Sequence, residues 1–177
     1  MKPLRPDQVE VSQQNGLKVY LNPSALDRAR LVYTAVGAPS EKAAKDLTLS
    51  NTIAPERVAV VEGAAPDLGG CSGGSVQISR YDPSLVVMKA DAPCRGMLIL
   101  ADVWFPGWKA TVDGHPAKIY KAYNLVRGVV VEPGKHQVVM TYQPMSVFAG
   151  LALGLLGIAT CVAICRFGSL SRSVVAG

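Results

Sequence analysis

The feature that most constrains this chain is an uncharged, apolar run near its C-terminus, from Val147 to Cys165. As an α-helix, which rises about 1.5 Å per residue, the run is roughly 28 Å long, close to the ~30 Å hydrocarbon core of a bilayer. A buried helix of a soluble protein rarely lacks a polar face over such a length. We therefore predict a membrane-spanning helix over residues 145–166. Its Gly150 and Gly154 could let another membrane helix approach closely, although glycine is common in membrane helices in general.

The charges that flank this run predict its orientation. Arg166 and Arg172 follow it, whereas no Lys or Arg occurs between Thr141 and Ser146. Because positive residues favour the cytoplasmic side, we expect a cytoplasmic tail over 167–177 and an extracytoplasmic body before residue 145, at the inner cell membrane. The first residues, MKPLRPDQVEVSQQNG, contain no apolar stretch like that of a signal peptide. We therefore expect the chain to be the C-terminal piece of a larger protein with several membrane helices.

The charge pattern argues against nucleic acid as a partner. The formal net charge is +5, but the positive residues are spread along the chain without a dense basic run or basic residues interleaved with aromatic ones. The length of 177 residues is enough for one domain with a hydrophobic core.

Most of the sequence before the apolar run alternates with a period of two, which is typical of β-strands. In KHQVVMTYQ, for example, His136, Val138, Met140 and Tyr142 share one face. The predicted strands cover residues 17–21, 30–35, 57–63, 75–81, 84–91, 97–105, 108–113, 117–122, 124–131 and 135–143. Ser40 can cap one short helix over 41–47. The pattern predicts a mainly β fold, an antiparallel β-sandwich of jelly-roll or lectin-like type over 17–143, after a linker or N-terminal extension over 1–16.

Three dipeptides predict turns between these strands. Asp113-Gly114 tolerates the positive φ angles of a tight hairpin turn, and Pro133-Gly134 suits a type II turn, as does Pro106-Gly107. The segment DVWFPGWKATVDGH, which contains both tryptophans, is therefore first of all a corner of a sheet with aromatic side chains at the ends of strands.

The four cysteines fall into two pairs. Cys71 and Cys94 could form a disulfide if the body lies in an oxidising compartment, which would fix the Gly-rich stretch APDLGGCSGGS to the sheet. Whether their Cβ atoms meet is left open by the sequence. Cys161 and Cys165 are expected to pack as small apolar residues in the span. No cysteine–histidine cluster has the spacing of a metal site, and we expect neither a metal nor a cofactor.

No catalytic constellation stands out, and we predict no catalytic residue. His115 and His136 lie near a turn and a strand start, without a nucleophile motif beside them. Asp102 and Asp113 could form a pair of carboxylates, but Asp113 already has a role in a turn.

The sequence supports binding of a glycan better than it supports catalysis. Aromatic residues cluster between Trp104 and Tyr123, and sugar rings stack on aromatic faces while charged groups hold their hydroxyls. The candidate glycan-binding residues are Trp104, Trp108, Asp113, Tyr123 and Arg127. The alternative is that these rings fill the core or lie at a membrane interface, where Trp and Tyr are favoured.

The order of motifs resembles the C-terminal part of the YfhO family. The strongest part runs through Pro106-Gly107-Trp108, Val112-Asp113-Gly114, Asn124, Arg127, Pro133-Gly134, His136 and Tyr142-Gln143-Pro144. Weaker likeness extends over nearly the whole chain beyond the first dozen or so residues, although Cys71 and Cys94 are not part of the pattern.

The resemblance implies a bacterial polytopic membrane protein related to the GT-C glycosyltransferases, with an external β-rich domain and a last helix. Some members are implicated in adding sugars to cell-envelope polymers from a lipid-linked donor. The catalytic acidic residue of GT-C enzymes lies in an early external loop that has no counterpart here, so we expect this chain alone to be non-catalytic. Its expected partners are the upstream membrane helices or a partner membrane subunit, the lipid bilayer, and a glycan or lipid-linked sugar. The alternative is a structural or protein-interaction module without glycan affinity.

Overall fold

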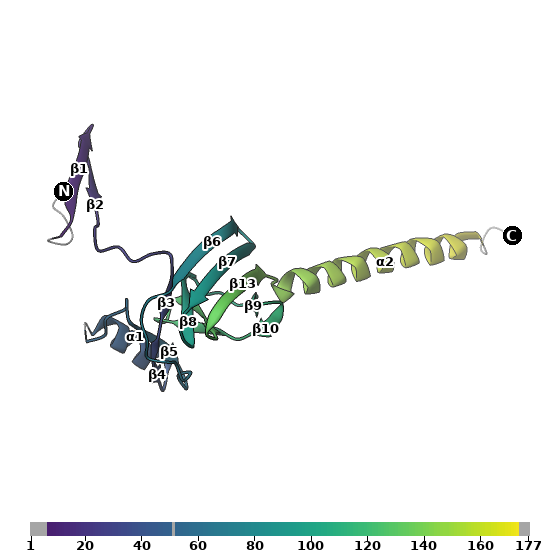
Figure 1. The fold of residues 1–177 in the computed structure, drawn as a ribbon. Coiled ribbons are helices and arrows are strands. Elements are labelled where there is room, and N and C mark those ends of the chain that lie inside the picture. The colour runs from purple at the N-terminus through teal and green to yellow at the C-terminus, as the bar shows by residue number, and fades with distance from the viewer. Residues whose placement is uncertain (1–6, 51, 174–177) are drawn as a thin grey trace.

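The computed structural model describes residues 7–50 and 52–173, with side chains through residue 164. It consists of a β-rich body, a small N-terminal hairpin that stands apart from the larger sheets, and one long helix that projects from the body (Figure 1). The predicted mainly β class, with several antiparallel sheets, one short helix and a C-terminal apolar helix, is confirmed.

The N-terminal hairpin differs from the sequence prediction. Strand β1 (Val9–Gln14) lies in the segment expected to be a linker, and it pairs with β2 (Leu17–Leu21), which was expected in the sandwich. Asn15 and Gly16, with φ of 49° and 77°, make a tight turn between the two strands, so the strands pair with each other in a sheet of their own. Apolar side chains of both strands are exposed: Val9, Val11, Leu17, Val19 and Leu21. Residues 1–6 of the predicted extension lie outside the described residues.

Two larger sheets form the body. The first has the order β10 (His115–Ala117), β9 (Trp108–Val112), β13 (Gly134–Tyr142), β7 (Leu85–Ala92) and β6 (Ser75–Asp82), and every pair in it is antiparallel. The second has the order β3 (Ala29–Val32), β8 (Gly96–Val103), β12 (Val126–Val131), β11 (Ile119–Ala122), β5 (Val58–Glu62) and β4 (Thr34–Ala38). Here β4 and β5 are parallel, and helix α1 (Glu41–Leu49) connects them. This parallel pair is a feature that the predicted antiparallel sandwich did not include.

The main core lies between the two sheets, as the period-two pattern predicts. Side chains alternate in and out, so that Leu98 and Leu100 of β8 meet Val138 and Met140 of β13 in one apolar cluster. A second cluster, which includes Met97 and Ile99, lies on the other face of the six-stranded sheet. The second sheet is therefore buried on both faces over much of its length.

The predicted turn dipeptides have the expected backbone. Asp113 and Gly114 have φ of 51° and 82° and join β9 to β10. Gly134 and Gly107, at the second positions of the two Pro-Gly pairs, have φ of 118° and 106°. Residues with positive φ at these places follow from turn chemistry that is visible in the sequence.

The Gly-rich segment between β5 and β6 is held to the body by a disulfide between Cys71 and Cys94. The amide of Gly69 donates to the carbonyl of Arg95, and Ala65 and Leu68 pack on the second apolar cluster. A Cβ at Gly69 would lie 2.5 Å from Sγ of Cys94, so glycine is required for this close approach. The disulfide that the sequence left open therefore fixes the loop that covers one face of the six-stranded sheet.

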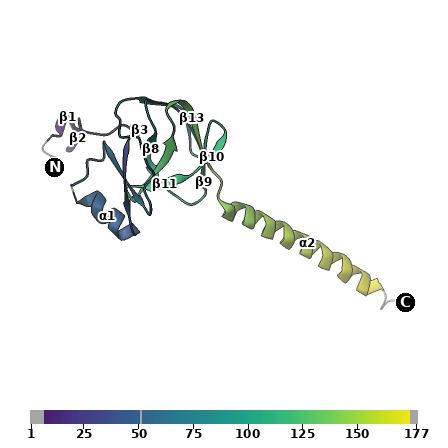
Figure 2. The same ribbon diagram turned by 60° about the horizontal axis from the view of Figure 1, so that its bottom comes forward.

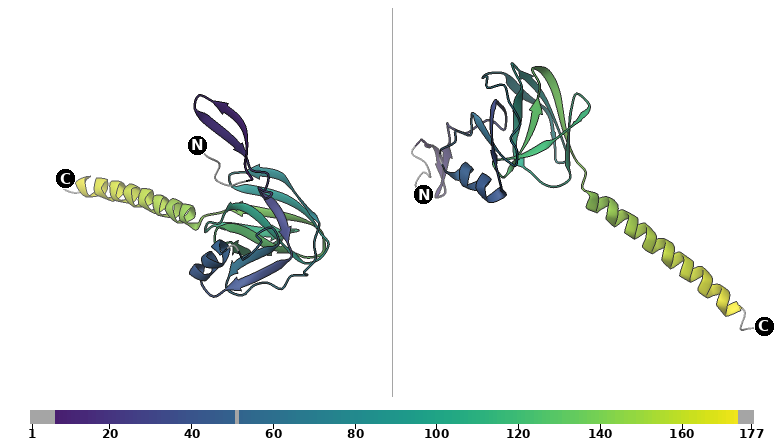
Figure 3. Two further views of the ribbon diagram at one scale, coloured as in Figure 1. Left: turned by 90° about the vertical axis from the view of Figure 1, so that its left-hand side faces the viewer. Right: turned by 90° about the horizontal axis from the view of Figure 1, so that it is seen from below.

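Helix α2 (Met145–Ser173) begins two residues after β13 and extends away from the body without packing against it (Figures 2 and 3). Residues 145–164 are long and apolar enough to cross a membrane, and none of this stretch is buried within the chain. Cβ atoms added at Gly150 and Gly154 would meet nothing within 4 Å. The helix continues through Ser173, beyond residue 166 and into the predicted tail. Residues 174–177 and the side chains of Cys165, Arg166 and Arg172 lie outside the described part of the chain.

Candidate functional site

The corner of the body from which α2 projects brings together the ends of several strands. Tyr142, at the end of β13, pairs with Trp108, at the start of β9. The amide of Gln143 donates to the carbonyl of Gly107 over 2.7 Å, and in Figure 2 β9 and β10 lie beside the first turn of α2. The predicted Pro106-Gly107 turn therefore lies directly against the junction between the last strand and the helix.

A register shift places an acidic side chain at this corner. Leu100 of β8 pairs with Arg127 of β12, but the next pair is Val103 with Val126, so Ala101 and Asp102 have no partner residue on β12. Such bulges often occur where a strand redirects a side chain next to a functional site. Asp102 is on the same strand face as Leu98 and Leu100, toward the layer between the sheets.

Asp102 forms a nearly buried ion pair with Arg127. Nη2 of Arg127 lies 2.9 Å from Oδ2 of Asp102, and the exposed fractions of the two side chains are 3% and 12%. Nη1 of Arg127 contacts the sulfur of Met140 at 3.8 Å. Its Nε is buried without a hydrogen-bond partner among the described residues. Removing either charge would leave the other poorly compensated, which is the costly case for a buried pair.

Aromatic rings extend this ion pair to the start of α2. The guanidinium carbon of Arg127 lies 3.7 Å from the ring centroid of Trp108, a cation–π contact. The ring of Trp108 is 5.4 Å from that of Tyr142, which in turn is 6.5 Å from that of Phe105. We call Asp102, Arg127, Trp108, Tyr142 and Phe105 the corner cluster. It links the layer between the sheets to the residues that precede α2.

A pocket of about 370 Å³, lined by both polar and apolar side chains, opens beside the corner cluster. Arg28, just before β3, lies 3.5 Å from Oδ1 of Asp102, and its guanidinium carbon is 4.8 Å from the ring centroid of Tyr81 on β6. The hydroxyl of Tyr81 donates to Oδ2 of Asp102 over 3.1 Å. Because Asp102 already receives contacts from Arg127, Tyr81 and Arg28, it is arranged to hold positive groups rather than to accept a proton from a substrate. The side chain of Arg28 is 58% exposed and can turn toward a ligand.

Burial affects the ionisation of this group of residues. Burial lowers the pKa of the Arg127 guanidinium, while the Asp102 carboxylate acts in the opposite direction. Burial also raises the pKa of the Tyr81 hydroxyl, and its hydrogen bond to Asp102 adds to that increase. The raised pKa keeps the Tyr81 phenol neutral at neutral pH, so the pocket offers a phenol beside the guanidinium of Arg28, which suits hydroxyl or phosphate oxygens.

The structure separates the other predicted glycan-binding residues from this corner cluster. Of the five, Trp108 and Arg127 contact each other directly. The Trp108 ring is contacted by two other side chains, Arg127 over its face and Tyr142 in a tilted ring contact. Trp104 lines a different pocket, of about 380 Å³, with Tyr120 and Lys121, whose Nζ is 5.8 Å from the Trp104 ring. Trp104 and Trp108 are both partly buried, and they line different pockets.

Asp113 lies in a third place, where it holds the β9–β10 turn to β13. Its Oδ1 accepts the amide of Gln137 at 2.8 Å, and its Oδ2 lies 2.6 Å from Nδ1 of His136. Two hydrogen bonds lower the pKa of Asp113, and the one from the amide of Gln137 has a larger effect than the one from His136. The bond to Asp113 raises the pKa of His136 above its ordinary value of 6.5. His136 therefore has a charge partner that its position in the sequence did not reveal.

Tyr123 occupies a fourth place, between β5 and the segment after α1. Its hydroxyl donates to the carbonyl of Pro55 over 2.7 Å, and Arg30 lies 5.5 Å from its ring centroid. Its φ of 50° belongs to the turn between β11 and β12. These contacts give Tyr123 a structural role in the described part of the chain, while glycan binding at this position stays a prediction.

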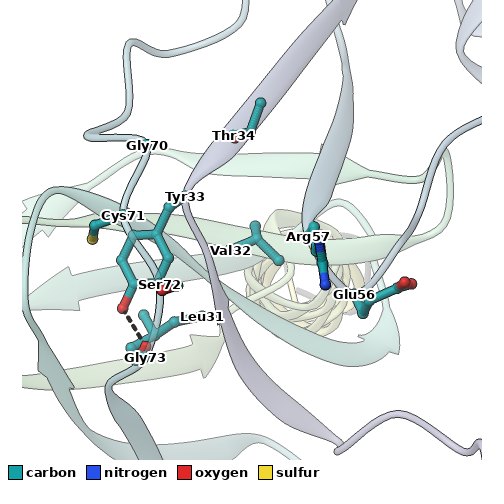
Figure 4. A pocket seen from close by; sticks show the side chains of 10 residues that line it. All are labelled: Leu31, Val32, Tyr33, Thr34, Glu56, Arg57, Gly70, Cys71, Ser72 and Gly73. Carbon is teal, nitrogen blue, oxygen red and sulfur yellow. Dashed lines mark hydrogen bonds between the residues drawn. The ribbon is translucent and has the colours of Figure 1, made fainter.

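A further pocket, of about 450 Å³, lies where the strand β3–β4 passes the disulfide-bonded loop (Figure 4). Tyr33 and the loop residues Cys71, Ser72 and Gly73 form one side, and Glu56 and Arg57 lie on the other. The hydroxyl of Tyr33 donates to the carbonyl of Gly73 over 2.8 Å. No predicted glycan-binding residue lines this pocket. Among the described residues, no group of three or more His, Cys, Asp and Glu side chains is placed to hold a metal ion.

Sequence reasoning identified Trp108 and Arg127 but missed the residues that complete the corner. Asp102 was considered as a partner of Asp113, whereas its partners are Arg127, Tyr81 and Arg28. Arg28 and Tyr81 carried no sequence signal, because they reach the site from distant parts of the chain, Arg28 from the segment before β3 and Tyr81 from β6 of the other sheet. The one clue was that Asp102 interrupts an otherwise apolar strand face.

We predict that Arg127→Met lowers the free energy of unfolding by about 3 kcal/mol, because the Asp102 carboxylate loses its buried partner. Adding Asp102→Asn should restore part of this loss, since it removes the uncompensated charge. The measurement is denaturant unfolding of the full chain in detergent micelles, followed by near-ultraviolet circular dichroism. Arg95→Met is the control, because Arg95 is half exposed and pairs with Glu132 at 3.4 Å. A loss at Arg127 no larger than at Arg95 would contradict the assigned role of the pair.

The Asp113–His136 contact predicts a pH dependence of stability. The raised pKa of His136 means that its contribution is complete below its ordinary value of 6.5 and is lost as the pH rises through the raised value. The lowered pKa of Asp113 means that its contribution is lost on the acid side, below 3.8. The unfolding free energy should therefore decline above pH 6.5, and this decline should be smaller in His136→Gln. The control is His115→Gln, at the start of β10, which leaves the His136–Asp113 bond in place and should keep most of the decline above pH 6.5; equal profiles for all three proteins would refute the role of the contact.

Comparison with known proteins gives a match for the segment that contains the corner cluster. The model of the family described as bacterial membrane protein YfhO matches residues 96–154, from the start of β8 into α2. This segment contains all five residues of the corner cluster and the junction with the helix. The weaker likeness noted for earlier residues lies outside the match. No curated protein and no solved structure was found to match the chain. The resemblance to the YfhO family of bacterial membrane proteins is thus confirmed for residues 96–154.

Proposed function

We propose that this chain is the C-terminal extracytoplasmic domain and last membrane helix of a YfhO-like protein, and that it assists the transfer of lipid-linked sugars onto cell-envelope glycopolymers. In this proposal α2 crosses the inner membrane, and the upstream membrane helices or a partner subunit supply the catalytic acid. The chain binds rather than catalyses, because the carboxylate at the corner is already occupied by positive groups and a phenol.

The observation that carries the binding part of the proposal is the pocket beside Arg28, Tyr81 and Asp102. It opens at the corner from which α2 begins, so a ligand that is attached to a lipid need not travel far from the bilayer to reach it. Arg28 offers an exposed guanidinium for a phosphate oxygen. Asp102 and Tyr81 offer polar atoms for sugar hydroxyls. The polar part of a lipid-linked sugar combines these two chemistries.

The disulfide supports the proposed orientation. Cys71 and Cys94 are joined in the β-rich body, and disulfides persist in oxidising compartments outside the cytoplasm. An extracytoplasmic body agrees with the positive residues that follow the apolar run and the absence of Lys and Arg from residues 141–146.

A structural module without glycan affinity is the second candidate, and one observation favours it. Arg127 lies over the Trp108 ring and Tyr142 packs 5.4 Å from it, so this ring already makes two contacts within the chain that reduce the face on which a sugar could stack. In this alternative the corner cluster serves to fix α2 to the body, and the pocket beside Arg28 has no ligand.

A binding experiment separates the two candidates. The full chain in lipid nanodiscs is titrated with a short-chain prenyl-phosphate glucose, and binding is measured by calorimetry. We predict saturable binding that Arg28→Gln weakens about tenfold, the effect of losing one charge-assisted hydrogen bond. Arg95→Gln is the matched control, since Arg95 is similarly exposed and pairs with Glu132, and it should bind as the wild type does. Trp104→Ala tests the neighbouring pocket and should have the smaller effect.

The outcomes of this titration are distinct. Absence of saturable binding by the wild type would favour the structural module. Equal loss in Arg28→Gln and Arg95→Gln would show a response to charge alone and contradict the pocket. A loss confined to Trp104→Ala would move the binding site to the pocket that Trp104 shares with Tyr120 and would overturn the role of Arg28.

The orientation has its own test. In spheroplasts that make the full chain, we predict that a membrane-impermeant maleimide labels Cys71 and Cys94 only after treatment with an impermeant thiol reductant, because the disulfide blocks both sulfurs. Replacing Cys161 and Cys165 by alanine in all samples removes the other thiols. Labelling that requires lysis of the spheroplasts would place the body in the cytoplasm and refute the proposed orientation.

A further inference from the structure

Three large apolar side chains are exposed where two adjacent segments meet the corner cluster. Val103, the last residue of β8, and Phe105, in the loop that follows, are 60% and 59% exposed, and Leu125, in the turn before β12, is 55% exposed. The two segments are joined by a hydrogen bond in which the amide of Trp104 donates to the carbonyl of Leu125 over 2.7 Å. We call these three residues the apolar rim. Exposed apolar groups that gather in this way commonly mark a contact surface.

The apolar rim is held firmly next to the beginning of α2. The ring of Phe105 lies 6.5 Å from that of Tyr142, three residues before Met145. A Cβ added at Gly107 would lie 3.0 Å from Cα of Pro144, which shows how closely the turn packs on the junction. Only Gln143 and Pro144 separate β13 from the helix. The part of the rim around Phe105 therefore lies close to the first turn of α2.

The first turn of α2 is also apolar and exposed. Met145, Val147 and Phe148 are 72%, 62% and 57% exposed. Tyr142, whose ring is 5.4 Å from that of Trp108, comes three residues before Met145, and Trp and Tyr are the residue types that favour the boundary between lipid and water. Lys109, exposed and opposite Thr141, provides a positive charge at the same level.

The opposite end of β13 has a different character. Lys135, at that end, is 86% exposed on its side chain and lies 3.9 Å from Asp91, whose side chain is 53% exposed. The nearby Arg95 and Glu132 are also exposed. The body thus has an apolar, aromatic end next to α2 and a charged end away from it.

We propose that the apolar rim sits in the lipid surface of the membrane that α2 crosses, so that Val103, Phe105 and Leu125 enter the boundary between headgroups and acyl chains. This inference rests on the membrane anchoring by α2 in the proposed function. A lipid surface is the occupant that fits, because Phe105 of the rim packs on Tyr142, and only Gln143 and Pro144 separate Tyr142 from a helix suited to lipid. The rim is a second contact with the bilayer that limits how far the body can tilt about the helix.

The proposal is tested with an environment-sensitive dye, NBD, attached to single cysteines in the full chain reconstituted in phosphatidylcholine–phosphatidylglycerol vesicles. The probe positions are Phe105→Cys and Leu125→Cys. Lys135→Cys is the control for the charged end, and Leu155→Cys, within α2, is the control for insertion of the helix. All four proteins carry alanine at residues 161 and 165 and retain the native disulfide, so that each has one reactive thiol. Lipids with a doxyl quencher near the headgroup report contact with the bilayer.

The expected result is blue-shifted emission at residues 105 and 125 and quenching at least about twofold stronger than at residue 135, as for groups that lie within 5–10 Å of the headgroup boundary. Quenching at residue 155 shows that the helix is inserted. If residue 155 is quenched but residues 105 and 125 are quenched no more than residue 135, the rim does not touch lipid and the inference is wrong, while the anchoring by α2 stands. If residue 155 is not quenched, the membrane anchoring itself fails, and the inference fails with it.

Discussion

The contact between Arg127 and its two partners, Asp102 and Trp108, is the interaction on which the arrangement of this protein depends. An arginine in the layer between two sheets is tolerated because a carboxylate neutralises it and an indole covers its flat face. Asp102 reaches it only because β8 bulges at this point. The same indole then packs on Tyr142, two residues before the end of the connection to α2. The buried charge therefore helps to determine where the helix leaves the body.

Much of the fold follows from local patterns that are visible in the sequence. The strands around Val138 and Met140 alternate because one face packs on the opposite sheet, and Asp113-Gly114 and Pro133-Gly134 turn the chain where their backbone preferences allow it. The parallel pairing of β4 with β5 was not visible, because it depends on how α1 packs and not on strand periodicity. The separate N-terminal hairpin was missed for a related reason: alternation shows that Leu17–Leu21 is a strand but not which strand it pairs with.

The candidate site was predictable only in part, and the reason is again the range of the interactions. Trp108 and Arg127 were identified by residue type and by their place in a recognisable order of motifs. Four strands from two sheets converge at this corner. This convergence brings Trp108 into contact with Arg127 and adds Asp102, Tyr81 and Arg28 to the site. Asp113 and Tyr123 have the residue types of a glycan site, but their polar atoms are used to hold a turn and a loop. Residue type alone does not distinguish these two uses of a polar side chain.

A lipid surface next to the corner cluster would change the electrostatics of the pocket. Coulombic interactions strengthen when water is replaced by a medium of lower dielectric constant, so the Asp102–Arg127 pair would be less screened there than on a free surface. Arg28, with an exposed side chain, would lie where headgroup phosphates are concentrated and could exchange its contact with Asp102 for one with a phosphate. Arg127 could not make this exchange, because it is enclosed by Asp102, Trp108 and Met140. The two arginines at this carboxylate therefore differ in exposure: Arg127 is enclosed within the body, whereas Arg28 has the exposed side chain that the proposed binding of a phosphate requires.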